Sequence, residues 1–449
     1  MVELTNSRIS GVITLLITIF SLSLPAYAQY SGGTGEPNDP YQIATAEDLM
    51  LLGDTPEDYD KHFIMTADID LDPNLPGRKV FDSAVIAPHY GYTGPFQETP
   101  FRGVFDGNGY TISHLTIKGG SYLGLFGELH YWAEISNLGL ENVDINGTYR
   151  VGGLVGYNNG GSIATSYSTG DVRGNTLIGG LVGYNNGYIT NCYSTAEVEG
   201  ENTVGGLVGA NYSENPESGM IHFWGEITRC YSIGLVMGNE NVGGLVGKIW
   251  WGADISLSFW DIETSGLPNM CGRDEIDARW DWDQVCDDSY GRATAEMQTA
   301  STFLEAGWDF IDEAENGMDN IWWIDEGKDY PRLWWELSLS ADHPDYDEWV
   351  EVGEPVCWCY KRQCHGDTDG KPQGKQQYWV STDDLDVLIA AWNKPFAEID
   401  GRTVNGAALI CADFDHKAQG KENYRVSTDD LDILIANWNQ ANAPSPDCP

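Results

Sequence analysis

A five-residue glycine-rich unit recurs along the middle of the chain and limits its fold more than any other feature. Gly-Gly-Leu-Val-Gly begins at residues 152, 179, 205 and 243, and a related Gly-Leu-Phe-Gly begins at residue 124. Counted from the glycine before each leucine, successive units are 29, 27, 26 and 38 residues apart. A second segment, Ser/Cys-Tyr-Ser, recurs between them at Ser166, Cys192 and Cys230. Repetition at such a period predicts stacked structural units rather than independent domains.

Each period is built from short runs of alternating apolar and polar residues, such as residues 163–167, separated by Gly, Asn and Ser. This pattern is typical of strands joined by tight corners, and no period has room for an amphipathic helix. One coil cannot bury its apolar face alone, whereas stacked coils share a continuous core. We therefore predict a mainly β fold, a right-handed parallel β-helix with three-sided coils, in which glycine supplies the corner angles. A propeller or a sandwich is the alternative, but a propeller blade needs about 40 residues or more.

The cysteines fall into three groups. Equivalent positions of successive coils stack about 4.8 Å apart, which places Ser166, Cys192 and Cys230 in one inward ladder, with both cysteines as small buried residues rather than a disulfide. Cys271 and Cys286 bracket a short insert and form a natural local disulfide pair. The other five are expected to support a small exported domain, although Cys357, Cys359 and Cys364 would alternatively hold zinc. These five are Cys357, Cys359, Cys364, Cys411 and Cys448.

The amino terminus and the overall charge predict an exported protein. Arg8 precedes an apolar run at residues 9–24, and residues 25–28 have the small-x-small pattern of a cleaved signal peptide over residues 1–28. An uncleaved anchor is the alternative, but the run is shorter than the roughly 20 apolar residues that a span needs. The chain has 24 Lys and Arg against 68 Asp and Glu, a net charge of −44. This charge argues against nucleic acid as a partner and favours either calcium binding or simple solubility outside the cell.

Changes in composition divide the mature chain into five predicted parts. A helix capped by Thr45 belongs to the first part, and Pro344 and Pro355 mark an acidic linker. The parts are an N-terminal cap with the first coils (29–120), the repeated coils (121–265), a Trp-rich C-terminal cap (266–336), the linker (337–363) and a small terminal domain (364–449).

The chain resembles the GLUG-repeat family of bacterial exported proteins in three features. These are the repeated Gly-Leu-x-Gly units, the segment Phe-Arg-Gly-Val-Phe-Asp-Gly-Asn-Gly-Tyr from Phe101, and the aromatic residues that end this region. The resemblance covers roughly residues 30–336. It implies a β-helix and a secreted or cell-surface setting. It implies no activity, because the family is not defined by catalysis.

A different repeat occupies residues 364–439. Val-Ser-Thr-Asp-Asp-Leu-Asp begins at Val380 and again at Val426, and each copy follows an Asp-x-Asp motif. The spacing between the motif and the repeat is the same in both copies. Each copy predicts a helix whose apolar residues share one face. These residues are Leu385, Leu388, Ile389 and Trp392 in the first copy, and Leu431, Leu434, Ile435 and Trp438 in the second.

Calcium prefers about six to eight hard oxygens, often from one compact loop closed by an acidic residue at a helix start. The candidate ligands are Asp367, Asp369 and Asp384 in the first copy, and Asp413, Asp415 and Asp430 in the second. The alternative is that Ser381 and Ser427 cap the helices and the acidic residues only complement the helix dipole.

The terminal pair resembles the dockerin family, which carries two calcium-loop–helix repeats and docks onto cohesin modules. The resemblance implies calcium as a cofactor and a cohesin-like partner. The span from first to last candidate ligand is 18 residues in each copy, whereas a standard calcium loop has about 12. His416 also stands where the first copy has Gly370.

No pattern in the sequence requires catalysis, and no nucleophile-elbow or metallo-hydrolase motif occurs. An acidic-polysaccharide lyase or hydrolase would place carboxylates beside basic residues on one coil face. His114 is expected as an outward strand residue. The available carboxylates are Asp106, Asp144, Asp171, Glu197 and Glu199, and the available cations are Arg102, Lys118, Arg150 and Arg173.

Adjacent tryptophans at 250–251, 322–323 and 334–335 would bind sugars if their rings were exposed and coplanar, but plugging the open end of the solenoid is the simpler role. We therefore expect a non-enzymatic secreted or cell-surface protein. Its β-helix would be an adhesive surface or spacer, and its tail a calcium-ordered attachment module for a cohesin-like protein or a polysaccharide. A polysaccharide-binding or polysaccharide-degrading β-helix protein is the alternative.

Overall fold

The computed structural model describes most of the chain between residues 30 and 337 and part of the carboxyl-terminal region. The described residues are 30–89, 99–213, 225–250, 252–275, 285–311, 316–317, 320–337, 382–392, 394, 399, 402–404, 407–413, 426 and 428–437. The predicted signal peptide and almost all of the predicted linker lie outside them. Within these ranges no helix has both the length and the apolar character needed to cross a membrane.

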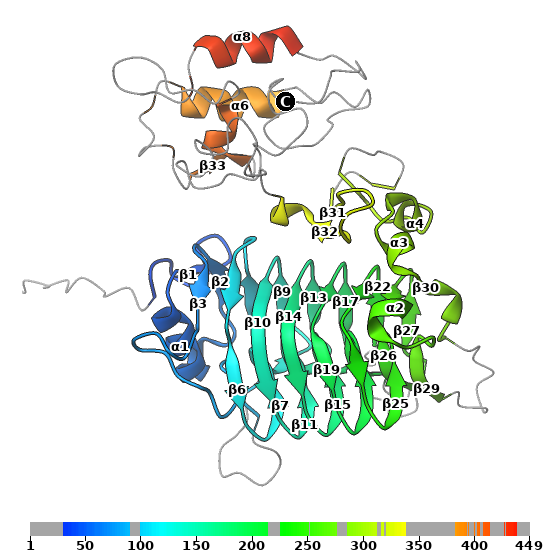
Figure 1. Cartoon of the computed structure of the whole chain (residues 1–449). Coiled ribbons are helices and arrows are strands. Elements are labelled where there is room, and N and C mark those ends of the chain that lie inside the picture. The colour runs from blue at the N-terminus through cyan, green and yellow to red at the C-terminus, as the bar shows by residue number, and fades with distance from the viewer. Residues whose placement is uncertain are drawn as a thin grey trace, which may run out of the picture.

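Residues 41–292 wind into a parallel β-solenoid whose coils stack along one axis (Figure 1). Four parallel sheets, here called sheets I to IV, run along the stack. Sheet I contains β1 (Tyr41–Ile43), β2 (His62–Met65), β4 (Val104–Asp106), β9 (Glu134–Ser136), β13 (Ser162–Ala164), β17 (Tyr188–Thr190), β22 (Glu226–Thr228) and β27 (Asp254–Ser256). Sheet II contains β3 (Ile69–Asp70), β5 (Thr111–Ser113), β10 (Gly139–Asn146), β14 (Tyr167–Arg173), β18 (Tyr193–Ser194), β23 (Tyr231–Ser232), β28 (Phe259–Asp261) and β30 (Gly291–Arg292), with β6 (Thr116–Lys118), β19 (Glu197–Glu199) and β24 (Val236–Met237) alongside.

The two remaining large sheets are shorter. Sheet III contains β7 (Ser121–Leu123), β11 (Tyr149–Val151), β15 (Thr176–Gly179), β20 (Asn202–Gly205) and β25 (Glu240–Gly243). Sheet IV contains β8 (Phe126–His130), β12 (Val155–Asn159), β16 (Val182–Asn185), β21 (Val208–Tyr212), β26 (Val246–Trp250) and β29 (Cys271–Glu275). The predicted parallel β-helix is thus confirmed, but each repeated coil crosses four sheets rather than three. The extra side arises because the Gly-Gly-Leu-Val-Gly unit itself forms the junction between sheets III and IV.

The glycines of that unit allow close packing, which corrects the expectation that they supply corner angles. None of the glycines in the four units, all of which the structure describes, has a φ angle in the left-handed region. A Cβ atom on Gly180 would instead lie 2.1 Å from the Ser194 hydroxyl oxygen and 2.3 Å from the Gly206 carbonyl oxygen. No larger residue fits there without moving the neighbouring coil.

Residues other than glycine occupy the left-handed corner positions. One series lies between sheets I and II, with φ from 43° to 53°, and the other lies within sheet III, with φ from 52° to 64°. Asn tolerates this region better than other non-glycine residues, and it recurs in both series. The first series is Asn108, Asn137, Thr165, Asn191, Arg229 and Leu257, and the second is Tyr122, Arg150, Leu177, Thr203 and Asn241.

Inward side chains form buried ladders from coil to coil. The predicted ladder of Ser166, Cys192 and Cys230 is confirmed: all three are fully buried, and both cysteines are free thiols. Ser258 extends this ladder, because its hydroxyl oxygen accepts a hydrogen bond of 3.1 Å from the Cys230 amide. The ladder joins neighbouring coils by side-chain contacts in addition to the parallel strand pairing.

A second buried ladder consists of asparagines at the corner between sheets IV and I. The Asn158 side-chain amide donates to the Asn185 side-chain oxygen, and Asn185 donates likewise to Asn211, each at 2.8 Å. Asn185 also donates to the Gly187 carbonyl oxygen at 2.9 Å and accepts from the Gly187 amide at 3.3 Å. Each asparagine therefore fixes its own turn and bonds to the next coil.

The two ends of the stack differ. Near the amino-terminal end, α1 (Ala46–Asp54) begins after Thr45, whose hydroxyl accepts a hydrogen bond from the Asp48 amide at 3.1 Å, as predicted; η1 (Pro56–Asp58) follows it. Near the other end, Trp260 replaces the serine of earlier coils and is fully buried against Gly244. The predicted disulfide between Cys271 and Cys286 is present at this end.

Short elements lie between the last strands of the solenoid and after them. These are α2 (Ile262–Ser265), η3 (Asp288–Tyr290), α3 (Thr294–Met297), α4 (Ala300–Leu304), and an antiparallel pair of β31 (Trp322–Trp323) and β32 (Arg332–Leu333), followed by η4 (Trp334–Glu336).

The carboxyl-terminal part has its own small core. It contains the two predicted helices, α6 (Thr382–Ala391) and α8 (Thr428–Asn437), with β33 (Thr403–Val404), β34 (Ala407–Ala408) and η7 (Leu409–Ala412). Leu388 and Leu434 are buried as predicted, but Ile389 and Ile435 are 60% and 59% exposed. Neither isoleucine therefore packs in this core. The first helix instead buries Val387 and Ala391 beside Leu388, so its packed face is rotated from the one we predicted.

Replacing Asn185 with Ala should lower the free energy of unfolding by about 3 kcal/mol, because it leaves buried donors and acceptors without partners on both sides of the coil. Urea unfolding followed by far-ultraviolet circular dichroism measures this loss. Asn175→Ala is the matched control, because Asn175 is exposed. Equal unfolding midpoints for the two variants would show that the asparagine ladder does not stabilise the stack.

Candidate functional site

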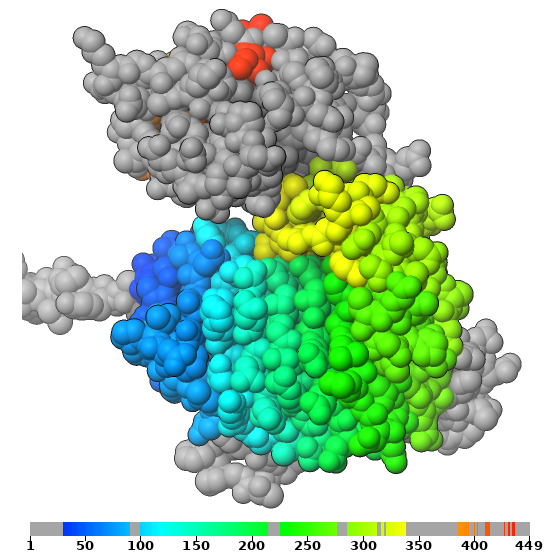
Figure 2. Space-filling view, viewed as in Figure 1, coloured from blue at the N-terminus to red at the C-terminus, as the bar shows by residue number. Residues whose placement is uncertain are grey.

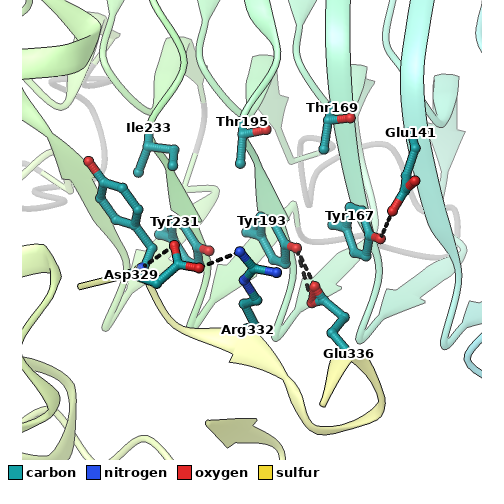
Figure 3. A pocket seen from close by; sticks show the side chains of 11 residues that line it. Glu141, Tyr167, Thr169, Tyr193, Thr195, Tyr231, Ile233, Asp329, Arg332 and Glu336 are labelled. Carbon is teal, nitrogen blue, oxygen red and sulfur yellow. Dashed lines mark hydrogen bonds and ion pairs between the residues drawn. The ribbon is translucent and has the colours of Figure 1, made fainter. Parts of the chain in front are cut away.

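The outer surface of sheet II carries a ladder of tyrosines. Tyr167, Tyr193 and Tyr231 are in register on β14, β18 and β23. Their ring centroids are 4.8 and 4.9 Å apart, and their planes are inclined by only 12° and 5°. The ring faces are therefore covered by one another, and the ring edges with their hydroxyl groups point outward (Figure 3).

The Trp-rich segment covers this ladder. Trp335 stacks on Tyr167 at 5.5 Å and 18°, and Trp322 lies 6.0 Å from Tyr231. Trp308 donates a hydrogen bond of 2.8 Å to the Leu257 carbonyl oxygen and so ties the segment to the coils. We expected these tryptophans to plug the open end of the solenoid. They lie instead along its side, where Figure 2 shows the yellow segment against the green coils.

The packing of the tryptophans leaves little surface for sugar stacking. Trp322 is fully buried and Trp335 is 6% exposed, while Trp323 and Trp334 are half-buried. Among the tryptophans that the structure describes, only Trp132 is mostly exposed, at 69%. The described part of the chain therefore lacks the pair of exposed coplanar tryptophan rings that sugar binding by these pairs required.

A cavity of about 200 Å³ lies between the tyrosine ladder and the returning segment (Figure 3). Hydroxyl groups, carboxylates and one guanidinium line most of it. The lining residues are Glu141, Tyr167, Thr169, Tyr193, Thr195, Tyr231, Ile233, Asp329, Tyr330, Arg332 and Glu336.

Glu336 is the main polar contact between the returning segment and the ladder. Its carboxylate accepts a hydrogen bond of 2.6 Å from the Tyr193 hydroxyl and one of 2.9 Å from the Leu333 amide. Burial raises the pKa of Glu336 to about 7, although these two hydrogen bonds and the charge of Arg332 oppose that rise. Glu336 therefore changes its charge near neutral pH.

The other two ladder hydroxyls are also engaged. Tyr167 donates to Glu141 at 2.8 Å, and Tyr231 donates to the Pro331 carbonyl oxygen. Burial, followed by the negative charge of Glu336, raises the pKa of all three ladder tyrosines above its usual range. They therefore remain protonated hydrogen-bond donors, and their arrangement holds the segment in place rather than supplying a base or a nucleophile.

Several of the predicted catalytic candidates meet on sheet II, where β6, β10, β14 and β19 carry them. Arg173 lies 2.8 Å from Asp171, 3.5 Å from Asp144 and 3.7 Å from Glu199. Lys118 lies 3.4 Å from Asp144. These side chains are 35% to 60% exposed, and the two cations balance two of the three carboxylate charges.

The remaining candidates are separate from this cluster. Asp106 accepts hydrogen bonds from the Asn108 amide at 2.8 Å and the Asn137 side chain at 3.0 Å, so it serves a corner. His114 is 47% exposed and lies 2.9 Å from Asp70, consistent with the predicted outward strand position. The side chains not accounted for here are Arg102 and Glu197, which are exposed, and Arg150, which lies on sheet III.

The structure describes only part of the predicted calcium site. Asp367, Asp369 and Asp415 lie outside the described residues, and of Asp384 only the backbone, in α6, is described. Asp413, directly after η7, and Asp430, in the first turn of α8, are both fully buried. Within the described ranges, no group of three or more His, Cys, Asp or Glu side chains is placed to hold a metal ion. Cys411 is disulfide-bonded.

The sequence analysis missed the covered tyrosine ladder, although a signal for it was present. In each Ser/Cys-Tyr-Ser segment the first and third residues face inward, so the tyrosine between them must face outward. Three such tyrosines in register form an aromatic surface that another segment would be expected to cover. The tryptophans that cover it lie 77 or more positions beyond the tyrosines that they contact, and no local pattern links them to it.

Comparison with known proteins identifies the repeats. Residues 147–173 and 174–199 each match the GLUG motif. These repeats are GLUG motifs. The first motif spans β11, β12, β13 and β14, and the second spans β15 to β19. One GLUG motif therefore corresponds to one complete coil with a strand in each of the four sheets.

Two further similarities are more limited. A segment of 130 residues is 32% identical to halomucin of Haloquadratum walsbyi; it covers 28% of this chain but only 1% of halomucin. A crystal structure of a Bacteroides ovatus protein assigned as an immunoglobulin A1 protease shares 22% identity, over 52% of this chain and 70% of that one, with a TM-score of 0.41. Neither similarity extends to an activity of this chain.

The raised pKa of Glu336 makes the attachment of the returning segment dependent on pH. Between roughly pH 4.5 and 7 this residue is protonated when folded and ionised when unfolded, so stability falls as the pH rises through that window, by about 3 kcal/mol in total. Hydrogen exchange of residues 320–337 should therefore be faster at about pH 8 than the base catalysis of amide exchange alone predicts. Glu336→Gln retains an acceptor for Tyr193 and should abolish this step, and an unchanged pH dependence in the variant would contradict the assignment.

Proposed function

We propose that this chain is a non-enzymatic secreted or cell-surface protein whose β-helix provides a rigid adhesive surface or spacer. The observation that carries the proposal is that the reactive side chains on sheet II are engaged with partners on the same sheet or on the returning segment. The three ladder tyrosines donate hydrogen bonds to neighbouring acceptors, and Arg173 is shared by three carboxylates. Catalysis needs a group that is free to exchange a proton or a bond with a substrate.

The ladders support the mechanical part of the proposal. Buried serine, cysteine and asparagine side chains link successive coils at two separate corners, so bending the stack would break hydrogen bonds on both. Such a stack presents equivalent outer positions at a spacing of about 4.8 Å. A regular array of weak contacts gives avidity without a deep pocket.

Three disulfide-bonded cysteines support export. Cys271 and Cys286 are joined, and Cys411 is also disulfide-bonded. Disulfides persist in oxidising compartments and are rare where thiols are kept reduced. A secreted or surface location also agrees with the signal-peptide pattern and the net charge of −44.

We further propose that the carboxyl-terminal pair is a calcium-ordered attachment module. Asp413 and Asp430 are fully buried in a core made mainly of apolar side chains, a setting in which two carboxylates favour a nearby divalent cation. Bound calcium would balance the negative charge of the two carboxylates, and Asp415 would join Asp413 and Asp430 in holding it. Ile389 and Ile435 occupy equivalent, exposed positions in the two copies and would contact a cohesin-like protein.

The proposal predicts that calcium stabilises the terminal helices. Adding calcium to the mature chain should slow hydrogen exchange in residues 382–392 and 428–437 by at least about tenfold, and a chelator should reverse the effect. Asp413→Asn combined with Asp430→Asn should remove the response of 428–437, whereas Asp386→Asn, at an exposed position, should not. Exchange that is indifferent to calcium in the unaltered chain would refute the calcium module.

A polysaccharide lyase or hydrolase is the second candidate, favoured by the cluster of Lys118, Arg173 and three carboxylates on sheet II. The two candidates predict different results when the mature chain is incubated with acidic polysaccharides. If the protein is adhesive, the immobilised chain retains the polysaccharides and releases no new reducing or unsaturated chain ends from them. Release of chain ends that Asp171→Asn abolishes and Asn175→Ala leaves unchanged would establish the enzyme and overturn our proposal.

A further inference from the structure

A second group of aromatic residues lies where sheets III and IV meet, away from the tyrosine ladder. Its centre is Arg150 on β11, at one of the left-handed positions, with φ 56°. The guanidinium carbon of Arg150 lies 4.3 and 4.4 Å from the ring centroids of Tyr157 and Tyr184. It lies 5.0 and 5.3 Å from those of Tyr122 and Tyr149. Four tyrosine rings therefore surround one cation.

Within the described part of the chain, Arg150 has no acidic partner. No described carboxylate lies within 4.0 Å of its guanidinium, and its buried Nε has no hydrogen-bond acceptor. Two other cations of the coils differ in this respect: Lys248 lies 3.8 Å from the Trp250 ring centroid but also 2.9 Å from Glu275, and Arg173 has three carboxylates. In a chain with a net charge of −44, a cation held only by aromatic rings is an exception.

The rings around Arg150 belong to a longer aromatic strip. It passes from Tyr122 through Tyr157, Tyr184 and Tyr212 to Trp250, with neighbouring centroids 5.4 to 6.3 Å apart. The interplanar angles range from 36° to 81°, so these rings do not cover one another as the sheet II tyrosines do. Tyr149, beside the strip, is 37% exposed.

We propose that Arg150 and its tyrosines bind the carboxylate or sulfate group of an acidic saccharide. A guanidinium offers five N–H donors in a planar fork that matches the oxygens of either anion. The surrounding rings hold the fork in place, and tilted aromatic faces beside it suit the apolar face of a sugar ring. Because the Nε of Arg150 is buried, the oxyanion would pair with the two Nη amino groups of the guanidinium.

The charge of the protein narrows the ligand further. A densely charged polyanion would be repelled by a net charge of −44. The site therefore suits a saccharide in which acidic residues are spaced among neutral ones. This inference names a ligand class for the adhesive surface proposed above and rests on that role for its biological meaning, but the binding itself is tested separately.

Isothermal titration calorimetry of the mature chain at low ionic strength tests the site with four probes: glucuronate, glucose 6-sulfate, glucose and inorganic sulfate. We expect glucuronate, glucose 6-sulfate or both to bind, and the one that binds identifies the oxyanion. Glucose lacks the anionic group and inorganic sulfate lacks the sugar ring, so each should bind at least about tenfold more weakly. Equal binding of either simple probe, or no binding of both acidic sugars, would overturn the proposal.

Variants assign the binding to this site. Arg150→Gln should weaken binding of the acidic sugar at least about tenfold, and Arg150→Lys, which keeps the charge but not the fork, should weaken it less. The lysine variant also keeps the test decisive if the glutamine variant does not fold. Arg102→Gln, at an exposed position outside both this group and the sheet II cluster, is the matched control and should bind normally. Unchanged binding in both Arg150 variants would overturn the assignment.

The outcome is separable from that of the adhesive role. Binding of small acidic sugars through Arg150 without retention of the chain on any polysaccharide surface would uphold the site and refute adhesion. Retention on polysaccharide that does not depend on Arg150 would refute the site alone.

Discussion

The close approach of successive coils at the glycine junction is the constraint on which the rest of the solenoid depends. At Gly180 the space available for a Cβ atom is already taken by Ser194 of the same coil and the Gly206 carbonyl of the next. This contact fixes the distance between sheet II and the junction of sheets III and IV. Small serine side chains therefore fill the interior opposite glycine, and in each Ser/Cys-Tyr-Ser segment the tyrosine lies on the outer surface. The covered tyrosine ladder follows from this arrangement.

The outer aromatic residues behave in two ways that depend on their geometry. On sheet II the tyrosines stack nearly parallel, so their faces satisfy one another and a tryptophan segment seals the edge. Beside Arg150 the rings are tilted and surround a cation instead. The same residue type thus packs against itself on one face and surrounds a cation on another. Exposure alone does not distinguish these roles, whereas the angles between rings and the partners of nearby charges do.

The glycine repeat predicted the parallel coils and the inward serine and cysteine ladder. The short spacing of Cys271 and Cys286 predicted their disulfide, and the second repeat predicted the two terminal helices. The glycine repeat did not predict the fourth side of the coil. The sequence of the five-residue unit does not show whether the unit continues one strand or joins two sheets. The role of glycine was also misjudged: sequence reveals that a Cβ is absent but not whether a dihedral angle or a neighbouring atom excludes it. The sheet II site escaped prediction because Glu336 and Tyr193 are 143 positions apart and meet only in the folded chain. The sequence analysis named Asp144, Asp171 and Arg173 without predicting that they meet. The strand register places Asp144 opposite Asp171, two residues before Arg173.

The coincidence of one GLUG motif with one coil has a consequence for how such a molecule can change its length. Every ladder, at the asparagine corner as at the serine and cysteine corner, bonds a residue to its counterpart in the next coil. A whole motif inserted into the stack would therefore meet the same partners on both sides and require no new interface. The reach of the protein can change only in discrete increments of about 4.8 Å per motif. Such additions fit only before Trp260, where the indole occupies the interior position that the next serine would need.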